Sequence, residues 1–292
     1  MHPSKYILAL TLSSFLASCN FSPTPIPIEV DEPEQRLVVS SFALPPQELI
    51  VTLSRTFSAL IAQGDSLDLS NSAIQESILV DSAEVKLSYA GKTVELFKIA
   101  PGVYGSIEVE RIPGASYELS VKDFDTGLTC TAETIVLPQI SLDTLYPISR
   151  ILPNLGDTLY SFKYNFLDPV GTEDYFLVTY TRSNWIFEEV LTPGGNLFNS
   201  GSNYFNAFSD KNTGDGKEIS FEPNALFAQG DTVLVGISNI PKQHYEFLSA
   251  YKKSGNLFSQ LVSEPINLPS NVENGYGYFS MTIPSFKTVV LQ

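Results

Sequence analysis

Hydrophobic and polar residues alternate with a period of two along much of the chain. Leu49, Val51 and Leu53 fall on every second position, and the polar residues Thr52 and Ser54 alternate with the last two of them. Because successive side chains of a strand point to opposite faces of a sheet, this pattern predicts a strand with one buried and one solvated face. The pattern recurs in later segments, at residues 83–89, 117–121, 160–166, 175–180 and 231–238. We therefore expect a mainly β protein built from antiparallel strands.

Glycine and proline residues separate the alternating runs in the first half of the chain. They do so at Ala90-Gly91, Pro101-Gly102, Pro113-Gly114 and Thr126-Gly127. Short strands that recur about every 8–12 residues between such turns are typical of antiparallel β-sandwiches. We therefore expect residues 37–138 to form an N-terminal immunoglobulin-like β-sandwich.

A second series of strands is expected after residues 138–157, which contain three prolines and show little periodicity. We interpret that segment as the connection to a C-terminal β-sandwich domain over residues 139–292. The first strand of this domain carries an aromatic residue at every second position: Tyr160, Phe162, Tyr164 and Phe166. This row is expected to form the core face of the second sandwich, because large aromatic side chains are usually buried. The alternative is an exposed aromatic platform that binds sugars or peptides.

One short helix is expected in the second domain, after residue 239. Asn239 is suited to cap its N-terminus, and Pro241 is tolerated in a first helical turn. Gly255 is expected to end the helix. Between them, an apolar stripe follows the helical spacing i, i+3, i+4, i+7, at His244, Phe247, Leu248 and Tyr251.

Residues 1–18 have the features of a bacterial lipoprotein signal peptide. Lys5 supplies a positive charge, and the apolar stretch over residues 6–16 spans 11 residues, too few for a transmembrane helix. The stretch ends in Ala17-Ser18-Cys19, and small residues directly before a cysteine resemble a lipobox. We therefore expect cleavage before Cys19 and its acylation, with palmitate among the chains, which anchors the protein in a membrane. The alternative is an ordinary signal peptide with an accidental cysteine.

Residues 19–36 are expected to form a lipidated, proline-rich stalk. Prolines at positions 23, 25, 27 and 33 favour extended geometry there and at the preceding residues. We interpret the acidic residues of this segment as a solvated linker, with a signal for surface export as the alternative. Asn20, and not aspartate, follows the cysteine, which favours the outer membrane over retention in the inner membrane.

Composition limits the classes of function open to the chain. Of its 292 residues 43% are hydrophobic and the formal net charge is −15, so a core can form and no nucleic-acid partner is expected. His244 is the only histidine after residue 18, which argues against a Ser-His-Asp triad or a multi-histidine zinc site. With Cys19 acylated, Cys130 is the single remaining thiol, so no intramolecular disulfide forms, and we interpret it as a small buried residue. We therefore expect no catalytic residue and no cofactor.

The segment from Asp210 to Glu218 is a candidate calcium loop. An EF-hand-type loop has oxygen ligands at positions 1, 3 and 5 and glycine at position 6. Asp210 and Asn212 fit the first two positions, but Gly214 occupies position 5 and Asp215 comes one place late. The alternative is a polar, glycine-rich hairpin turn, and the sequence leaves the choice open.

Residues 183–209 combine aromatic side chains with asparagine, serine and glycine. Such a composition is common on recognition surfaces, where rigid aromatic rings supply contact area and polar residues supply hydrogen bonds. The candidate ligand-binding residues are Trp185, Phe187, Tyr204 and Phe205. The alternative is that these side chains anchor the loop in the second core.

Several short motifs occur in an order that resembles a known family. They include Arg36-Leu-Val-Val-Ser40, Val51-Thr-Leu-Ser-Arg55, Asn165-Phe-Leu-Asp-Pro169, Glu173-Asp-Tyr-Phe176 and Asn274-Gly-Tyr-Gly-Tyr-Phe279. The order resembles that of the Bacteroidota outer-membrane lipoprotein family known as domain of unknown function 4249, over nearly the whole chain after the leader. The family has no established catalytic residues, so the resemblance implies none here. Its members are often encoded beside TonB-dependent receptors, which implies an accessory role in uptake or surface binding.

Three functional hypotheses follow from these observations. The first is a non-enzymatic lipoprotein, anchored in the bacterial outer membrane, that binds ligand for a TonB-dependent transporter or docks onto it. The second is a structural or adhesive cell-surface module without a small ligand. The third is a hydrolase with paired carboxylates, which the 32 acidic residues leave open.

Overall fold

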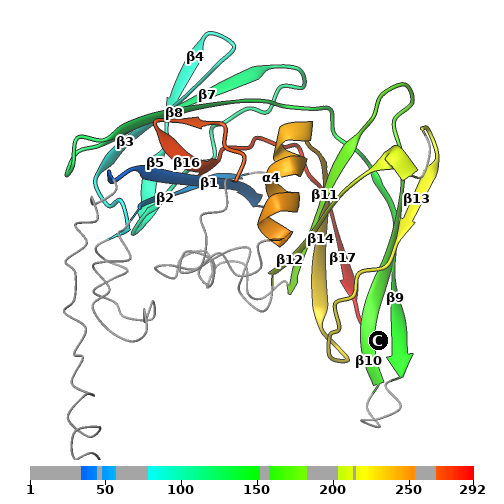
Figure 1. Ribbon diagram of the computed structural model, residues 1–292. Helices are drawn as coiled ribbons and strands as arrows, with labels where there is room; N and C mark the ends of the chain where they lie inside the picture. The colour runs from blue at the N-terminus through cyan, green and yellow to red at the C-terminus, as the bar shows by residue number, and fades with distance from the viewer. Residues whose placement is uncertain are drawn as a thin grey trace, which may run out of the picture. The chain divides into compact units, whose positions relative to one another are not determined.

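The computed structural model describes residues 34–44, 48–56, 78–151, 158–182, 203–212, 215–253 and 268–292 (Figure 1). The predicted signal peptide, Cys19 and most of the predicted stalk lie outside these residues, so their properties stay predictions. The described residues are mainly β-strand, which confirms the expected fold class at this level. Among them, no helix is long and apolar enough to cross a lipid bilayer.

Two five-stranded sheets hold the strands from the first half of the chain together with two short C-terminal strands. Sheet 1 has the order β16-β1-β2-β6-β5, and sheet 2 has the order β15-β8-β7-β3-β4. The strands of sheet 1 are β1 (Leu37–Leu44), β2 (Glu48–Arg55), β5 (Phe97–Ala100), β6 (Val103–Ser106) and β16 (Gly275–Tyr278). Those of sheet 2 are β3 (Ala83–Tyr89), β4 (Lys92–Glu95), β7 (Ser116–Asp123), β8 (Thr129–Ile135) and β15 (Val272–Glu273).

The alternation seen in the sequence is reproduced in the burial of these strands. Every second residue of β7 is buried, beginning with Tyr117, and β3 buries Val85, Leu87 and Tyr89. Residues of both sheets contribute to one hydrophobic cluster, in which the rings of Tyr89 and Tyr117 stack with their centroids 4.7 Å apart. Cys130 belongs to the same cluster, and its burial raises the pKa of its thiol to about 11. It is therefore a buried core residue, as expected.

The C-terminal part of the chain returns to this first cluster. β16 pairs in parallel with β1, and β15 pairs antiparallel with β8. Gly277 in β16 has a φ of +94°, and a Cβ atom there would collide with the backbone of Val39. Glycine is the residue that tolerates both conditions. This explains why the motif Asn274-Gly-Tyr-Gly-Tyr-Phe279 has glycine at position 277. Four side chains from this part are buried in the cluster: Val272, Phe279, Met281 and Ile283. The division into two domains at residue 138 stays a prediction. It did not foresee that residues from the C-terminal part pack into the first cluster.

Sheets 3 and 4 hold the remaining strands, and all neighbours in them pair antiparallel. Sheet 3 has the order β13-β10-β9, with β9 (Leu142–Ile151), β10 (Thr158–Leu167) and β13 (Glu218–Phe221). Sheet 4 has the order β12-β11-β14-β17, with β11 (Tyr175–Arg182), β12 (Asn203–Ser209), β14 (Thr232–Asn239) and β17 (Ser285–Val290).

A second hydrophobic cluster contains side chains from both of these sheets. The aromatic row of β10 lies in it: Tyr160 is 9% exposed, and Phe162, Tyr164 and Phe166 are fully buried. The interpretation of this row as a core face is therefore confirmed, and the alternative of an exposed platform is wrong.

The predicted helix is α4 (Lys242–Lys253), which contacts β11 and β12. Its apolar stripe faces inward, with Leu248 and His244 buried. The ring of His244 stacks on that of Tyr278 in β16, with centroids 4.7 Å apart. Burial lowers the pKa of His244 to about 3, so the ring is neutral near pH 7 and serves as a core side chain.

Asn239 does not cap this helix. Its amide nitrogen instead donates a hydrogen bond to Asp174, at 3.3 Å. The carbonyl of Pro241 accepts the first helical hydrogen bond, from the backbone N–H of Tyr245 at 3.1 Å, so the helix begins directly after the proline. The side chain of Asn239 therefore contacts Asp174 and not the N-terminus of the helix.

Candidate functional site

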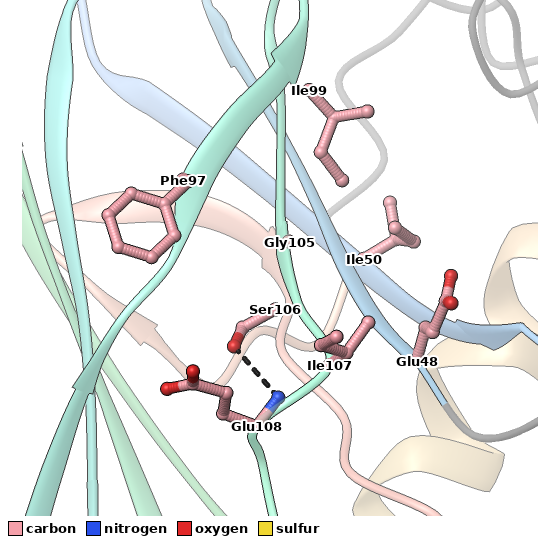
Figure 2. A pocket seen from close by; sticks show the side chains of 8 residues that line it. All are labelled: Glu48, Ile50, Phe97, Ile99, Gly105, Ser106, Ile107 and Glu108. Atoms are coloured by element: carbon pink, nitrogen blue, oxygen red, sulfur yellow. Dashed lines mark hydrogen bonds between the residues drawn. The ribbon is translucent and has the colours of Figure 1, made fainter.

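Two features outside the hydrophobic clusters are candidates for function. The first is a hollow of about 250 Å³ beside β5, the edge strand of sheet 1 (Figure 2). Its lining is mostly apolar, with two carboxylates at the rim. The lining residues are Glu48, Ile50, Phe97, Ile99, Gly105, Ser106, Ile107 and Glu108.

Gly105 lines the hollow at a position where a side chain would not fit. A Cβ atom at this position would lie 2.6 Å from Cδ1 of Ile99 and 2.8 Å from the backbone oxygen of Leu49, so any larger residue would disturb the lining. Figure 2 shows Phe97 and Ile99 on opposite sides of Gly105, and Ile107 between the two glutamates. Phe97 is 63% exposed and Ile107 is 80% exposed. Large apolar side chains gathered at an exposed edge are typical of a contact surface for another molecule.

The second feature is a group of three buried carboxylates, two from the connection between β10 and β11 and one from the residue after β12. Asp168 directly follows β10, Asp174 directly precedes β11, and Asp210 begins the 3-10 helix η1 (Asp210–Asn212) after β12. The pairing of Tyr175 with Ser209 between β11 and β12 brings the last two together. One carboxylate oxygen from each aspartate lies within 4.8 Å of the others, and each residue is at least nine-tenths buried.

Backbone and side-chain donors hold part of this group in place. Oδ2 of Asp168 accepts the N–H of Gly216 at 2.9 Å, and Oδ2 of Asp174 accepts the hydroxyl of Thr172 at 3.0 Å. Oδ1 of Asp174 accepts the Nδ2 hydrogen of Asn239. Two buried oxygens have no hydrogen-bond partner among the described residues: Oδ1 of Asp168 and Oδ1 of Asn239.

The electrostatics of the group oppose its full ionisation. Burial raises the pKa of Asp168, and the negative charges of Asp210, Asp174 and Asp215 raise it further, against the hydrogen bond from Gly216. Burial likewise raises the pKa of Asp210, and the negative charges of Asp174 and Glu173 raise it further, against a backbone hydrogen bond with Asp174 that lowers it. Buried charges of one sign are stable only with a compensating cation or after protonation. The arrangement is therefore suited to hold a positive charge.

The sequence pointed to one member of this group. Asp210 was the first position of a candidate calcium loop in which Asn212 was the next fitting residue, with a polar hairpin turn as the alternative. In the structure the other two carboxylates come instead from the segment between β10 and β11. Asp215 contacts that segment by accepting the N–H of Gly171 at 2.7 Å. The sequence did carry a signal for the other two carboxylates. Asp168 lies in the motif at the end of β10, and Asp174 lies in the motif at the start of β11.

The candidate aromatic site is described only in part. Trp185, Phe187 and the side chain of Tyr204 lie outside the described residues, so their role stays a prediction. Phe205, in β12, is half-buried. It packs against a small hydrophobic cluster formed by Tyr175, Ile240 and Leu248. Its ring centroid is 6.3 Å from that of Tyr251. For this one residue the contacts are those of an anchor in the protein interior.

These features define a mainly β protein with several antiparallel sheets, an exposed apolar hollow and a buried acidic group. The family that matches the chain is described as domain of unknown function (DUF4249), with residues 23–284 matched, and the chain belongs to this family. The resemblance inferred from the motifs is thereby confirmed at the level of the family. A search of curated proteins found no match to the chain.

Proposed function

We propose that this protein is a non-enzymatic lipoprotein of the Bacteroidota outer membrane that serves as an accessory subunit of a TonB-dependent transporter. Acyl chains on Cys19 anchor it, and residues 19–36 carry the folded part as a stalk. Two immunoglobulin-like sandwiches form the body, over residues 37–138 and 139–292, and β15 and β16 of the second segment return to the sheets of the first. The alternation of the strands and the presence of two large hydrophobic clusters support this arrangement.

The exposed hollow at β5 and β6 is the observation that carries the proposed docking role. Burying one large apolar side chain contributes about 1.5–3 kcal/mol, so Phe97 and its neighbours offer a substantial part of a binding energy. Glu48 and Glu108 frame the surface, and the whole chain has a formal charge of −15. The partner surface is therefore expected to be apolar at its centre and basic at its rim.

The burial of the three clustered aspartates argues against their use as catalytic carboxylates. Asp168, Asp174 and Asp210 are at least nine-tenths buried, whereas the carboxylates of a glycoside hydrolase must reach a substrate. The neutral, buried His244 is likewise unsuited to act as a general base.

Affinity purification from solubilised outer membranes tests the proposal. The wild-type chain is expected to retain a β-barrel receptor, and Phe97→Ser is expected to reduce the amount retained about tenfold or more, because it removes apolar contact area. Phe124→Ser is the matched control, since Phe124 is 58% exposed but lies outside the hollow. The control should retain the receptor as the wild type does. If no receptor is retained by the wild type, or Phe97→Ser retains it fully, the docking proposal is wrong.

A further inference from the structure

The buried acidic group has the size of a cation site. Calcium binds oxygen ligands at about 2.3–2.6 Å, so two oxygens on opposite sides of one ion are about 5 Å apart. The oxygens of Asp168, Asp174 and Asp210 all lie within 4.8 Å of one another, which is within this limit. Asp168 and Asp174 lie at the two ends of the connection between β10 and β11, whereas Asp210 is far from both in the sequence, so the fold brings Asp210 to the other two.

A second and independent observation comes from Asn239, which is not acidic. It is 6% exposed, and its Oδ1 has no hydrogen-bond partner among the described residues. Its Nδ2 donates to Asp174, so the amide lies against the acidic group. Leaving a buried amide oxygen without a donor is unfavourable, because the oxygen loses its hydrogen bonds to water and gains none in the protein. Like this oxygen, Oδ1 of Asp168 has no hydrogen-bond partner among the described residues, and a cation bound by the carboxylates would give both oxygens a partner.

We propose that Asp168, Asp174 and Asp210, together with Oδ1 of Asn239, bind a calcium ion. Every ligand atom is an oxygen, the type that calcium prefers, and the flexible coordination of calcium tolerates ligands from irregular loops. Magnesium requires near-ideal octahedral geometry at about 2.0–2.1 Å, which would draw all of these oxygens closer together. Zinc prefers nitrogen and sulfur ligands, and the group contains neither.

The ion joins two sheets. Asp168 extends β10 of sheet 3, whereas Asp174, Asp210 and Asn239 belong to the ends of β11, β12 and β14 of sheet 4. Calcium therefore fastens the two sheets at one edge of the second hydrophobic cluster, close to the start of α4. This role is independent of the proposed docking function, since the ligands lie outside the hollow.

Thermal unfolding of the full chain, purified in detergent and treated with a chelator, tests the site. Calcium at about 100 times its dissociation constant is expected to raise the Tm by about 5–10 °C, because it binds the folded state only. Magnesium at the same concentration is expected to give a clearly smaller shift. Isothermal titration of the wild type should show one site, with a dissociation constant of about 10⁻⁶–10⁻³ M.

Asp168→Asn and Asp174→Asn are expected to abolish the calcium-dependent rise in Tm. Asp143→Asn is the matched control, because Asp143 is an exposed aspartate of β9 in sheet 3, and it should keep the full response. In chelator, Asp168→Asn should unfold at or above the wild-type Tm, since it removes one of the repelling charges. Comparing the Tm of Asp168→Asn and the wild type in chelator therefore distinguishes the loss of a metal ligand from damage to the fold, since a damaged fold would lower the Tm in chelator as well.

Two outcomes overturn the proposal. The first is a chelated wild type that shows neither heat on titration with calcium nor a change in Tm, which would mean that protons neutralise the group instead. The second is a folded Asp168→Asn variant that keeps the wild-type response to calcium, which would place the ion elsewhere on this acidic chain.

Discussion

Replacing Arg55 by methionine is expected to destabilise the protein by about 3–5 kcal/mol. Arg55, at the end of β2, donates from Nε and Nη2 to the two carboxylate oxygens of Asp123, at 2.6 and 2.9 Å. Asp123 is fully buried, and the arginine side chain is 9% exposed. Removing the guanidinium leaves a buried carboxylate without its counter-charge, which is the main cause of the expected loss. The pair joins sheet 1 to the end of β7 in sheet 2.

Chemical denaturation at pH 7 measures this effect. Lys86→Met is the matched control, because Lys86 pairs with Glu84 at 2.6 Å on the surface, with side chains 43% and 40% exposed. Exposed pairs contribute about 0–1 kcal/mol, so the control should change the free energy of unfolding little. An Arg55→Met variant that is as stable as Lys86→Met would contradict the role assigned to the buried pair.

The same pair predicts a dependence on pH. Although burial raises the pKa of Asp123, the hydrogen bonds from Arg55 and Thr126 outweigh it and lower the pKa below the ordinary value of 3.8. The stabilisation is therefore complete above the ordinary pKa and is lost as the pH falls through the lower pKa of the folded state. The difference in stability between the wild type and Arg55→Met should accordingly shrink in strong acid.

Phe166→Ala is the second substitution with a large expected effect, a loss of about 3–5 kcal/mol. The ring of Phe166 is fully buried in the second hydrophobic cluster. Its centroid lies 4.9 Å from that of Phe176, in an edge-to-face arrangement, and 6.1 Å from that of Phe208. Truncation removes these contacts and leaves a cavity that the surrounding rigid rings fill poorly.

Leu167→Ala provides the control for this prediction. Leu167 is the next residue of β10, points to the other face and is 59% exposed, so its truncation should cost well under 1 kcal/mol. The two variants are compared by the denaturant concentration at the midpoint of unfolding, provided that the dependence of the free energy of unfolding on denaturant is the same in both. Equal losses in the two variants would mean that the aromatic row of β10 is not a core face.

The sequence predicted those parts of the fold that are determined by neighbouring residues. The alternation over residues 117–121 became the regularly buried face of β7, and the stripe around Leu248 became α4. The return of residues 272–283 to the first cluster was not predicted. In this return, β16 pairs in parallel with β1, and Gly275 lies opposite Leu37. A contact between residues so far apart in the chain cannot be recognised from the pattern of neighbouring residues.

The candidate sites show the same distinction. The composition around Asp210 made the loop a candidate for calcium, with a polar turn as the alternative, because oxygen-rich loops can be recognised locally. Asp168 and Asp174 were quoted only as parts of family motifs, since their approach to Asp210 depends on the register between β11 and β12. Asn239 was expected to cap a helix, and its contact with Asp174 depends on the position of β14 beside β11. The exposed hollow was not predicted, because its lining comes mainly from β2, β5 and β6, and the pairing of these strands leaves no pattern in the local sequence.

The anchor at Cys19 is the claim on which the proposed place of the protein at the membrane depends. Metabolic labelling with a palmitate analogue, in a bacterium that processes lipoproteins, tests it most directly, with Cys19→Ala as the control. We predict that the wild-type chain carries the label and that the variant does not. An unlabelled wild-type chain, or equal labelling of the variant, would contradict the account.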